Sequence, residues 1–151
     1  MLKRILNLQL IEFALRIWTA GFVFIYGFFK YIQFEGAKLV DTPIQEASNF
    51  EMMWAFFGTT KAYPIFIGCI QMIGAFLLVF RKTKLLGALL LTPIFLNIIL
   101  LDILYGIPLG ALLNALLFQA VFLFIIIQQR AKIKAAFQLF LVDKTTNYNN
   151  K

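Results

Sequence analysis

The chain has no histidine and only one cysteine, Cys69, among its 151 residues. Without histidine, His-ligated haem and the zinc sites that use imidazole are excluded. A single cysteine cannot form an internal disulfide or run a two-thiol relay. No base accompanies Cys69 in the sequence, so we expect an inert buried thiol rather than a nucleophile. The sequence therefore predicts no covalently held cofactor and no metal site.

Charged residues are also scarce. They make up 14% of the chain and hydrophobic residues 62%, whereas an average soluble domain has roughly 25% and 45–50%. Four apolar segments account for most of this excess, at about residues 13–34, 62–80, 85–104 and 108–128. Each is close to the ~20 residues of a membrane-spanning helix, and none shows the alternation of a membrane barrel strand. We therefore expect an all-α integral membrane four-helix bundle.

The charges that remain are unevenly distributed, with 14 cations against 7 anions. Most cations fall before the first span, between the second and third, and after the fourth: Lys3, Arg4, Arg81, Lys82, Lys84, Arg130, Lys132 and Lys134. The positive-inside rule then places both termini in the cytoplasm, as in a multi-pass protein of the bacterial inner membrane. No aromatic residue interleaves a basic patch, so we expect no nucleic-acid partner.

Segments outside the spans are short. Residues 1–12 form an amphipathic lead-in that resembles the start of a signal peptide, but Glu12 and Arg16 interrupt it and no cleavage site follows. We expect an uncleaved first span. Residues 129–151 are expected to contain a basic cytoplasmic helix at 131–142 and a disordered tail from residue 143.

The first outer loop, residues 35–61, contains the helix-start signature Thr42-Pro43-Ile44-Gln45 and then the apolar stretch Phe50–Gly58. Threonine is a good cap, proline suits the first helical position, and glutamine at the third position closes a capping box. The stretch is too short to span a membrane, so we expect an extra interfacial or re-entrant helix over the outer mouth of the bundle, ending at Gly58. A functional lid and a plain surface helix both remain open.

One face of the first span combines small residues with a charge at each end. The residues on this face follow a three-to-four-residue spacing: Arg16, Ala20, Val23, Gly27 and Lys30. Small residues let a second helix approach closely, and charges inside a membrane usually face protein or water. We expect this face to point into the bundle.

Polar side chains within the spans are the candidate ligand-binding residues, because such residues are costly to insert into lipid. The set is Arg16, Tyr26, Lys30, Gln71, Asn97, Asp102, Asn114 and Gln119. Counting depth along each span places Arg16 in the inner third and Gln71 and Gln119 near the centre. The other five fall in the outer half. No catalytic residue is assigned.

Two interpretations of this set remain open. In one, it forms a polar pocket under the outer surface that binds a polar head or moves protons. In the other, the amides and a Lys30–Asp102 pair only hold the helices in register. Asp102 is the expected partner of Lys30 because both lie at similar depth, and Glu35 is the competitor.

Several short motifs together resemble the DoxX/DoxD-like family of small four-helix membrane proteins. They are an arginine early in the first span, then Gly27-Phe28-Phe29-Lys30, Gly68-x-x-Gln71-x-x-Gly74, and a basic link leading into Leu86-Gly87-Ala88. The resemblance covers roughly residues 13–128 and marks Arg16, Gly27, Lys30, Gly68 and Gly74 as signature residues. It implies a subunit of a quinone-linked oxidoreductase, such as a thiosulfate:quinone oxidoreductase.

The chain departs from the family pattern at one position. Where many relatives place glutamate in the middle of the second span, this chain has Gln71. An amide cannot take up or release a proton at physiological pH. The substitution weakens a proton-transfer role and leaves Asp102 as the acidic candidate well within a span.

The expected function is an accessory subunit of a membrane redox system, not catalytic alone, that binds a quinone or lipid head near Lys30, Asp102, Asn97 and Gln71. Its redox centres would lie on partner proteins, and membrane lipids, other membrane proteins or a second copy are the expected partners. A non-enzymatic scaffold or assembly subunit is the alternative. A small transporter or lipid-handling protein is a third hypothesis, against which stand four spans and no inverted repeat.

Overall fold

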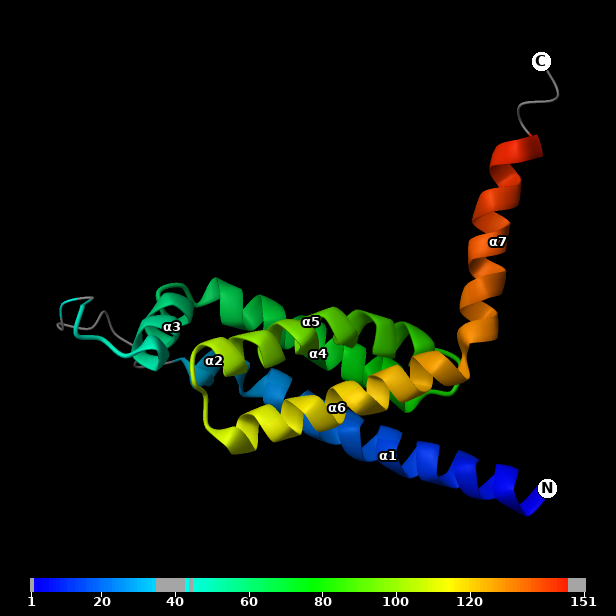
Figure 1. Ribbon diagram of the computed structural model, residues 1–151, viewed down its shortest axis with the longest axis horizontal. Helices are drawn as coiled ribbons and strands as arrows, with labels where there is room; N and C mark the ends of the chain where they lie inside the picture. Colours follow the sequence, from blue (N-terminus) through cyan, green and yellow to red (C-terminus); the bar gives the residue numbers. More distant parts are fainter. Residues whose placement is uncertain (1, 35–42, 44, 147–151) are drawn as a thin grey trace.

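The computed structural model describes the backbone of residues 2–34, 43 and 45–146, and the side chains of residues 7–34, 43 and 45–139 (Figure 1). Within these ranges the chain is helical and has no strand. The helices are α1 (Leu2–Phe28), α2 (Lys30–Gln33), α3 (Asn49–Gly58), α4 (Ala62–Val79), α5 (Lys84–Leu104), α6 (Leu109–Gln128) and α7 (Arg130–Thr146). The predicted all-α four-helix bundle is confirmed.

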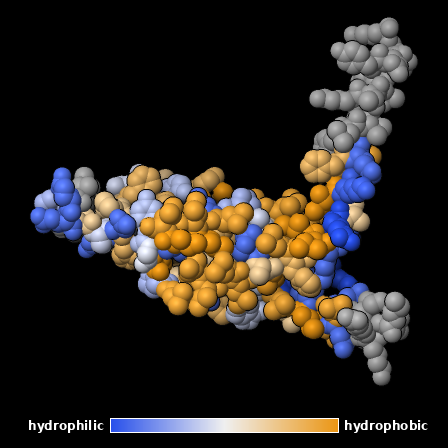
Figure 2. Space-filling view, viewed as in Figure 1, coloured by the Kyte–Doolittle hydropathy of each residue, from blue (hydrophilic) through white to orange (hydrophobic). Residues whose placement is uncertain are grey.

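Four of these helices are long and apolar enough to cross a membrane: α4, α5, α6 and the Asn7–Phe28 part of α1, with 18 to 22 residues each. Figure 2 shows a nearly continuous hydrophobic surface along the middle of the bundle, with hydrophilic residues gathered toward its two ends. A hydrophobic surface of this extent is stable against lipid and unfavourable in water. The chain is therefore a multi-pass membrane protein.

Helix α4 lies between α1 and α5, and α6 packs on α5. Glycines set both of the α4 contacts. A Cβ atom at Gly68 of α4 would collide with the carbonyl oxygen of Gly27 in α1, and one at Gly87 of α5 would lie 2.7 Å from the carbonyl oxygen of Gly74. Lipid chains are as apolar as the helices, so close backbone approach of this kind is a main source of helix association in membranes.

The predicted inward face of α1 is confirmed. Arg16, Ala20 and Val23 are buried, and Gly27 packs against α4. Lys30 lies beyond the end of α1 and lines a pocket that is described below.

The boundaries of the first span differ from the prediction. Helix α1 is continuous from Leu2, so the lead-in at residues 1–12 is not a separate element, and its first turns extend past the neighbouring helices (Figure 1). The helix ends at Phe28 rather than at residue 34. Phe29 leaves helical geometry, with ψ near 2°, and α2 follows as a single turn. No proline marks this break. The weak helix former next to it is Gly27.

Helix α3 ends at Gly58 as predicted but begins later than the sequence signature indicated. Thr42 and Ile44 lie outside the described residues, and Pro43 accepts a backbone hydrogen bond of 2.8 Å from Glu46 in a turn. The cap is instead Ser48, which forms a complete capping box with Glu51. Serine and glutamate at this spacing satisfy two of the free N–H groups of the first turn.

Helix α7 turns away from the bundle after Gln129 (Figure 1). The predicted helix at 131–142 is present, but the helix continues to Thr146. Asp143 to Thr146 are thus helical rather than a disordered tail, and residues 147–151 lie outside the described part.

Candidate ligand-binding pocket

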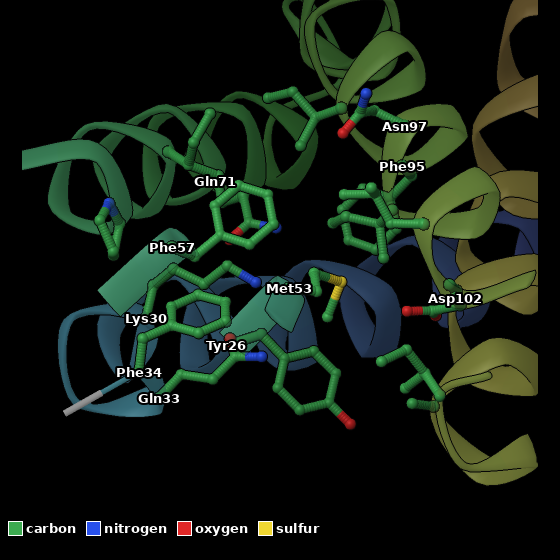
Figure 3. Close-up of a pocket in the computed structure, with 18 of the residues that line it drawn as sticks. Tyr26, Lys30, Gln33, Phe34, Met53, Phe57, Gln71, Phe95, Asn97 and Asp102 are labelled. Atoms are coloured by element: carbon green, nitrogen blue, oxygen red, sulfur yellow. The ribbon is translucent and has the colours of Figure 1, made fainter. Parts of the chain in front are cut away.

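A large open cavity lies at the end of the bundle where α3 and the α5–α6 turn are found (Figure 3). Its volume is about 890 Å³, and residues from each of α1 to α6 line it. We call this cavity the pocket and this end of the bundle the pocket end. Ligand sites typically measure roughly 300–1,000 Å³, so the pocket has room for a sizeable organic molecule.

Six of the eight predicted site residues line the pocket: Tyr26, Lys30, Gln71, Asn97, Asp102 and Asn114. They come from α1, α2, α4, α5 and α6, so the fold assembles them from across the sequence. Arg16 and Gln119 are not among the lining residues. The five polar residues predicted in the outer half do lie around one pocket, together with Gln71. Arg16, predicted in the inner third, and Gln119, predicted near the centre, lie outside it.

The end of α5 positions Asp102. Gly106 follows the helix with a φ of 66°, a left-handed conformation that glycine adopts without strain. The N–H of Ile107 then donates a 3.0 Å hydrogen bond back to the carbonyl of Asp102, as in a Schellman cap. Asp102 therefore sits in the last turn of α5, with its side chain only 9% exposed and facing the pocket.

Lys30 and Asp102 point into the pocket from opposite sides in Figure 3. Their opposite charges attract each other across the pocket, but within the described ranges they form no direct ion pair. The predicted contact between them is therefore absent, and its competitor Glu35 lies outside these ranges. The Lys30 ammonium instead lies 5.8 Å from the centroid of the Phe34 ring.

Aromatic side chains form the wall of the pocket beneath α3. Trp54 and Phe57 of α3 pack on Phe34, with ring centroids 4.7 Å and 5.3 Å away, and Phe57 also stacks on Tyr63 at 5.2 Å. These contacts join α3 to α2 and α4. No phenylalanine was among the predicted site residues, so this wall was not predicted from the sequence. The apolar α3 segment was the signal that could have indicated it.

A second aromatic cluster connects α1 to α6. Phe118 lies 5.6 Å from Trp18 and 6.0 Å from Tyr26, measured between ring centroids. Phe95 of α5 meets the same ring edge-on at 5.7 Å. Phe118 itself is buried and lines the pocket. Aromatic rings therefore form part of the contact between α1 and α6.

Three buried glutamines, Gln71, Gln119 and Gln129, have side-chain atoms without a hydrogen-bond partner. The Oε1 atom of Gln71, which lines the pocket, and both side-chain polar atoms of Gln119 have no hydrogen-bond partner. Leaving a buried polar group unpaired costs roughly 1–3 kcal/mol. Gln71 is 1% exposed, so its unpaired acceptor is buried in the wall of the pocket.

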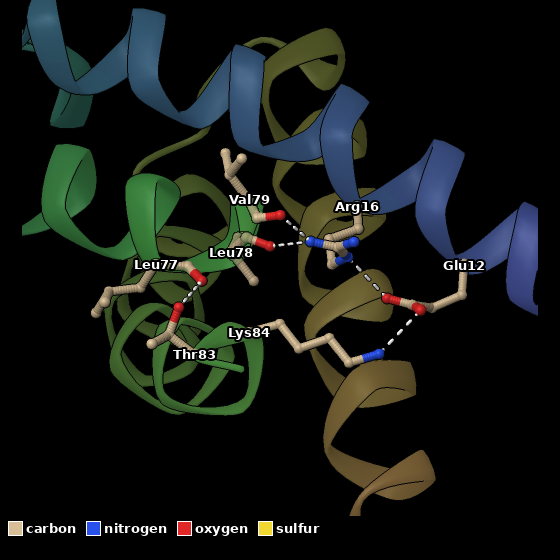
Figure 4. A network of polar contacts seen from close by, with 7 residues as sticks. All are labelled: Glu12, Arg16, Leu77, Leu78, Val79, Thr83 and Lys84. Carbon is tan, nitrogen blue, oxygen red and sulfur yellow. Dashed lines mark hydrogen bonds and ion pairs between the residues drawn. The ribbon is translucent and has the colours of Figure 1, made fainter. Parts of the chain in front are cut away.

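Arg16 belongs to a polar network at the opposite end of the bundle, which we call the Arg16 end (Figure 4). Its Nε donates a 2.9 Å hydrogen bond to Glu12, and its Nη1 donates to the carbonyls of Leu78 and Val79. The second oxygen of Glu12 accepts a 2.9 Å bond from Lys84. Arg16 therefore has a structural role at this end and lies outside the pocket that six of the other predicted site residues line.

This network satisfies the end of α4. The last carbonyls of a helix lack intrahelical partners and carry the negative end of its dipole. The Arg16 guanidinium donates hydrogen bonds to these carbonyls and places a positive charge at the negative end of the dipole. Glu12 and Lys84 were not predicted as partners of this network, although the i, i+4 spacing of Glu12 and Arg16 is typical of a helical ion pair.

Among the described residues, no three acidic or cysteine side chains come together as a metal ion requires. Cys69 is exposed on α4, so the prediction of a buried thiol is wrong.

Fold and pocket together define a multi-pass helical membrane protein with an aromatic-lined pocket at one end. No family model matches the chain. It is 34% identical over 90 residues to the uncharacterized protein YwoB of Bacillus subtilis (strain 168). The aligned part covers 58% of this chain and 57% of YwoB. The chain thus aligns with little more than half the length of that relative. No solved structure matches it. The resemblance to the DoxX/DoxD-like family stays a prediction.

Proposed function

We propose that this protein is an accessory subunit of a membrane redox system, and that it binds the polar head of a quinone or a lipid in the pocket. The observation that carries the proposal is the pocket itself, in which aromatic side chains surround a few polar groups. Ligand sites for amphipathic molecules have this composition. The DoxX/DoxD-like motifs suggest the redox system, and the redox centres would lie on partner proteins.

The proposal includes a location. The cations of the 81–84 link and of α7 flank the Arg16 end, and the positive-inside rule assigns such an end to the cytoplasm. Both termini would then be cytoplasmic in a bacterial inner membrane. The pocket would open toward the outer face.

The test is to extract the protein gently from its own membrane and to identify bound small molecules and companion chains by native mass spectrometry. We expect a retained quinone or lipid that is lost in the Lys30→Ala, Asp102→Ala double variant, together with impaired respiration. Lys132→Ala, on the exposed face of α7, is the matched control and should retain the ligand. A wild-type protein without ligand, and a double variant with normal growth and respiration, would reject the proposal.

Helix α7 favours a second function, that of a scaffold. Phe137 and Leu139 are 65% and 74% exposed on this helix, which lies away from the apolar middle of the bundle. Large apolar side chains in such a position are typical of a surface that contacts another protein. A scaffold predicts companion proteins without a small ligand in the same experiment. Their loss in a Phe137→Ser, Leu139→Ser variant would support it.

A further inference from the structure

The pocket contains one cation and one anion that face the same space without touching. Lys30 and Asp102 point inward from different helices, and neither forms an ion pair within the described ranges (Figure 3). At the Arg16 end, by contrast, both Arg16 and Lys84 contact Glu12. Buried charges are normally paired, so two separated charges in one cavity indicate a ligand that pairs with both.

Asp102 occupies a place that attracts a cation. It lies in the last turn of α5, where the helix dipole already presents negative partial charge and where a cation is the favoured occupant. A carboxylate here is locally unfavourable unless a positive group lies beside it. No cation of the described chain contacts it.

Lys30 supplies the complementary half. Its ammonium group has three donors and lies over the ring of Phe34, which cannot accept them as an anion would. Asp102 presents its carboxylate oxygens to the same pocket. The pocket therefore offers donors for an anion and acceptors for a group that bears N–H or O–H.

We infer that the pocket selects a zwitterionic amphiphile, whose anionic group binds Lys30 and whose ammonium group binds Asp102, as in the head of phosphatidylethanolamine. An uncharged quinone would leave both charges unpaired and has no donor for the carboxylate of Asp102. A purely anionic lipid would satisfy Lys30 but would face the carboxylate of Asp102. This inference rests on the proposed function, because it names which membrane molecule the pocket prefers.

The experiment uses Trp54 as the reporter, because it lines the pocket and the chain has only two tryptophans. In a Trp18→Phe protein, which leaves the pocket lining intact, Trp54 emission is titrated with three probes. They are dihexanoyl phosphatidylethanolamine, dihexanoyl phosphatidylglycerol and decylubiquinone. We expect phosphatidylethanolamine to bind about tenfold more tightly than phosphatidylglycerol, the value of one charge-assisted hydrogen bond.

Substitutions then assign the two charges. Asp102→Asn should abolish the preference for phosphatidylethanolamine, and Lys30→Gln should weaken both phospholipids about tenfold. Asp102→Glu and Lys30→Arg retain the charges and should retain the preference, which guards against variants that fail to fold. Glu46→Gln, in the turn before α3, and Lys132→Gln, on α7, are the matched controls and should behave as the parent.

Each outcome decides the inference. Equal binding of the two phospholipids, or a preference that Asp102→Asn leaves unchanged, overturns it. Tight binding of decylubiquinone alone overturns it while the proposed function stands. If no probe alters Trp54 emission, both fail.

Discussion

Both ends of the bundle hold charged side chains within the fold. These side chains are paired with one another at one end and separated at the other. At the Arg16 end, Arg16, Glu12 and Lys84 form a connected network with the last carbonyls of α4. At the pocket end, Lys30 and Asp102 remain apart across a cavity. Paired buried charges contribute to one defined structure, whereas unpaired ones reduce stability. The comparison separates residues that maintain the fold from residues that we propose bind a ligand.

The largest expected effect comes from breaking the network at the Arg16 end. Arg16→Ala leaves the buried carboxylate of Glu12 with one cation and the α4 carbonyls without a donor. Removing one partner of a buried ion pair typically costs about 3–5 kcal/mol. Thermal unfolding in detergent should show this loss. Arg16→Lys should recover only part of it, since an ammonium cannot reproduce the fork of a guanidinium.

Lys30→Ala, at the pocket end, is the variant to compare with Arg16→Ala in the same thermal unfolding measurement. It should change the free energy of unfolding by no more than about 1 kcal/mol, the usual range for a side chain outside a paired network. Equal destabilisation by Arg16→Ala and Lys30→Ala would contradict the distinction between the two ends.

The glycine contacts offer a second comparison. Gly68→Ala, at the pocket end, and Gly87→Ala, toward the Arg16 end, both force a Cβ into a backbone atom of the neighbouring helix. Overpacking of this kind costs about 1–3 kcal/mol. Both should lower the melting temperature, but only Gly68→Ala should also alter Trp54 emission, because it displaces α4 beside Lys30. Gly21→Ala and Gly110→Ala, with nothing within 4 Å of the added atom, should change neither.

Replacing both pocket charges sharpens the contrast further. The Lys30→Met, Asp102→Leu variant should be as stable as the wild type or more stable by up to about 2 kcal/mol, since apolar residues avoid the cost of burying charge. It should lose the ligand that native mass spectrometry detects. A clear loss of stability would show instead that the two charges maintain the fold.

The smallest effect concerns the start of α3. The Ser48 hydroxyl and its backbone N–H donate to Glu51, and these bonds hold the pKa of Glu51 below its ordinary value. A lowered pKa means that the stabilisation is present above the usual glutamate pKa and is lost as the pH falls through the lowered one. Acid should therefore loosen α3, and Trp54 emission in the Trp18→Phe protein should follow the change.

Ser48→Ala is the variant that tests the cap. It should reduce the stability of α3 by about 1 kcal/mol and flatten this pH dependence. Glu46→Gln, outside the capping box, is the control. The backbone N–H of residue 48 still donates to Glu51 in this variant, so only a pH response of undiminished size would assign it to another group.

The spans were predictable because hydrophobic length is a local property. Each predicted span of α4, α5 and α6 agrees with the structure to within about a residue at its ends, which is the usual uncertainty of helix boundaries. The end of α1 was not predictable, since Phe29 is an ordinary residue that leaves helical geometry only in its tertiary context. Local sequence also indicated α3 but selected the wrong cap.

The site was predictable only in part. Depth along each span correctly grouped Lys30, Asn97 and Asp102, because residues at equal depth in a bundle meet. Depth cannot show whether opposite charges touch, so the separation of Lys30 from Asp102 required the structure. The partners of Arg16 include main-chain carbonyls at the end of α4, and backbone acceptors leave no mark in a sequence.

The bonds of Arg16 also determine the order in which the protein can assemble. Glu12 and Arg16 enter the membrane with the first span, but their remaining partners, the α4 carbonyls and Lys84, are synthesised more than sixty residues later. Until then the first span has only the bond between its own two charges. The bundle can therefore close at this end only after the link to the third span has left the ribosome.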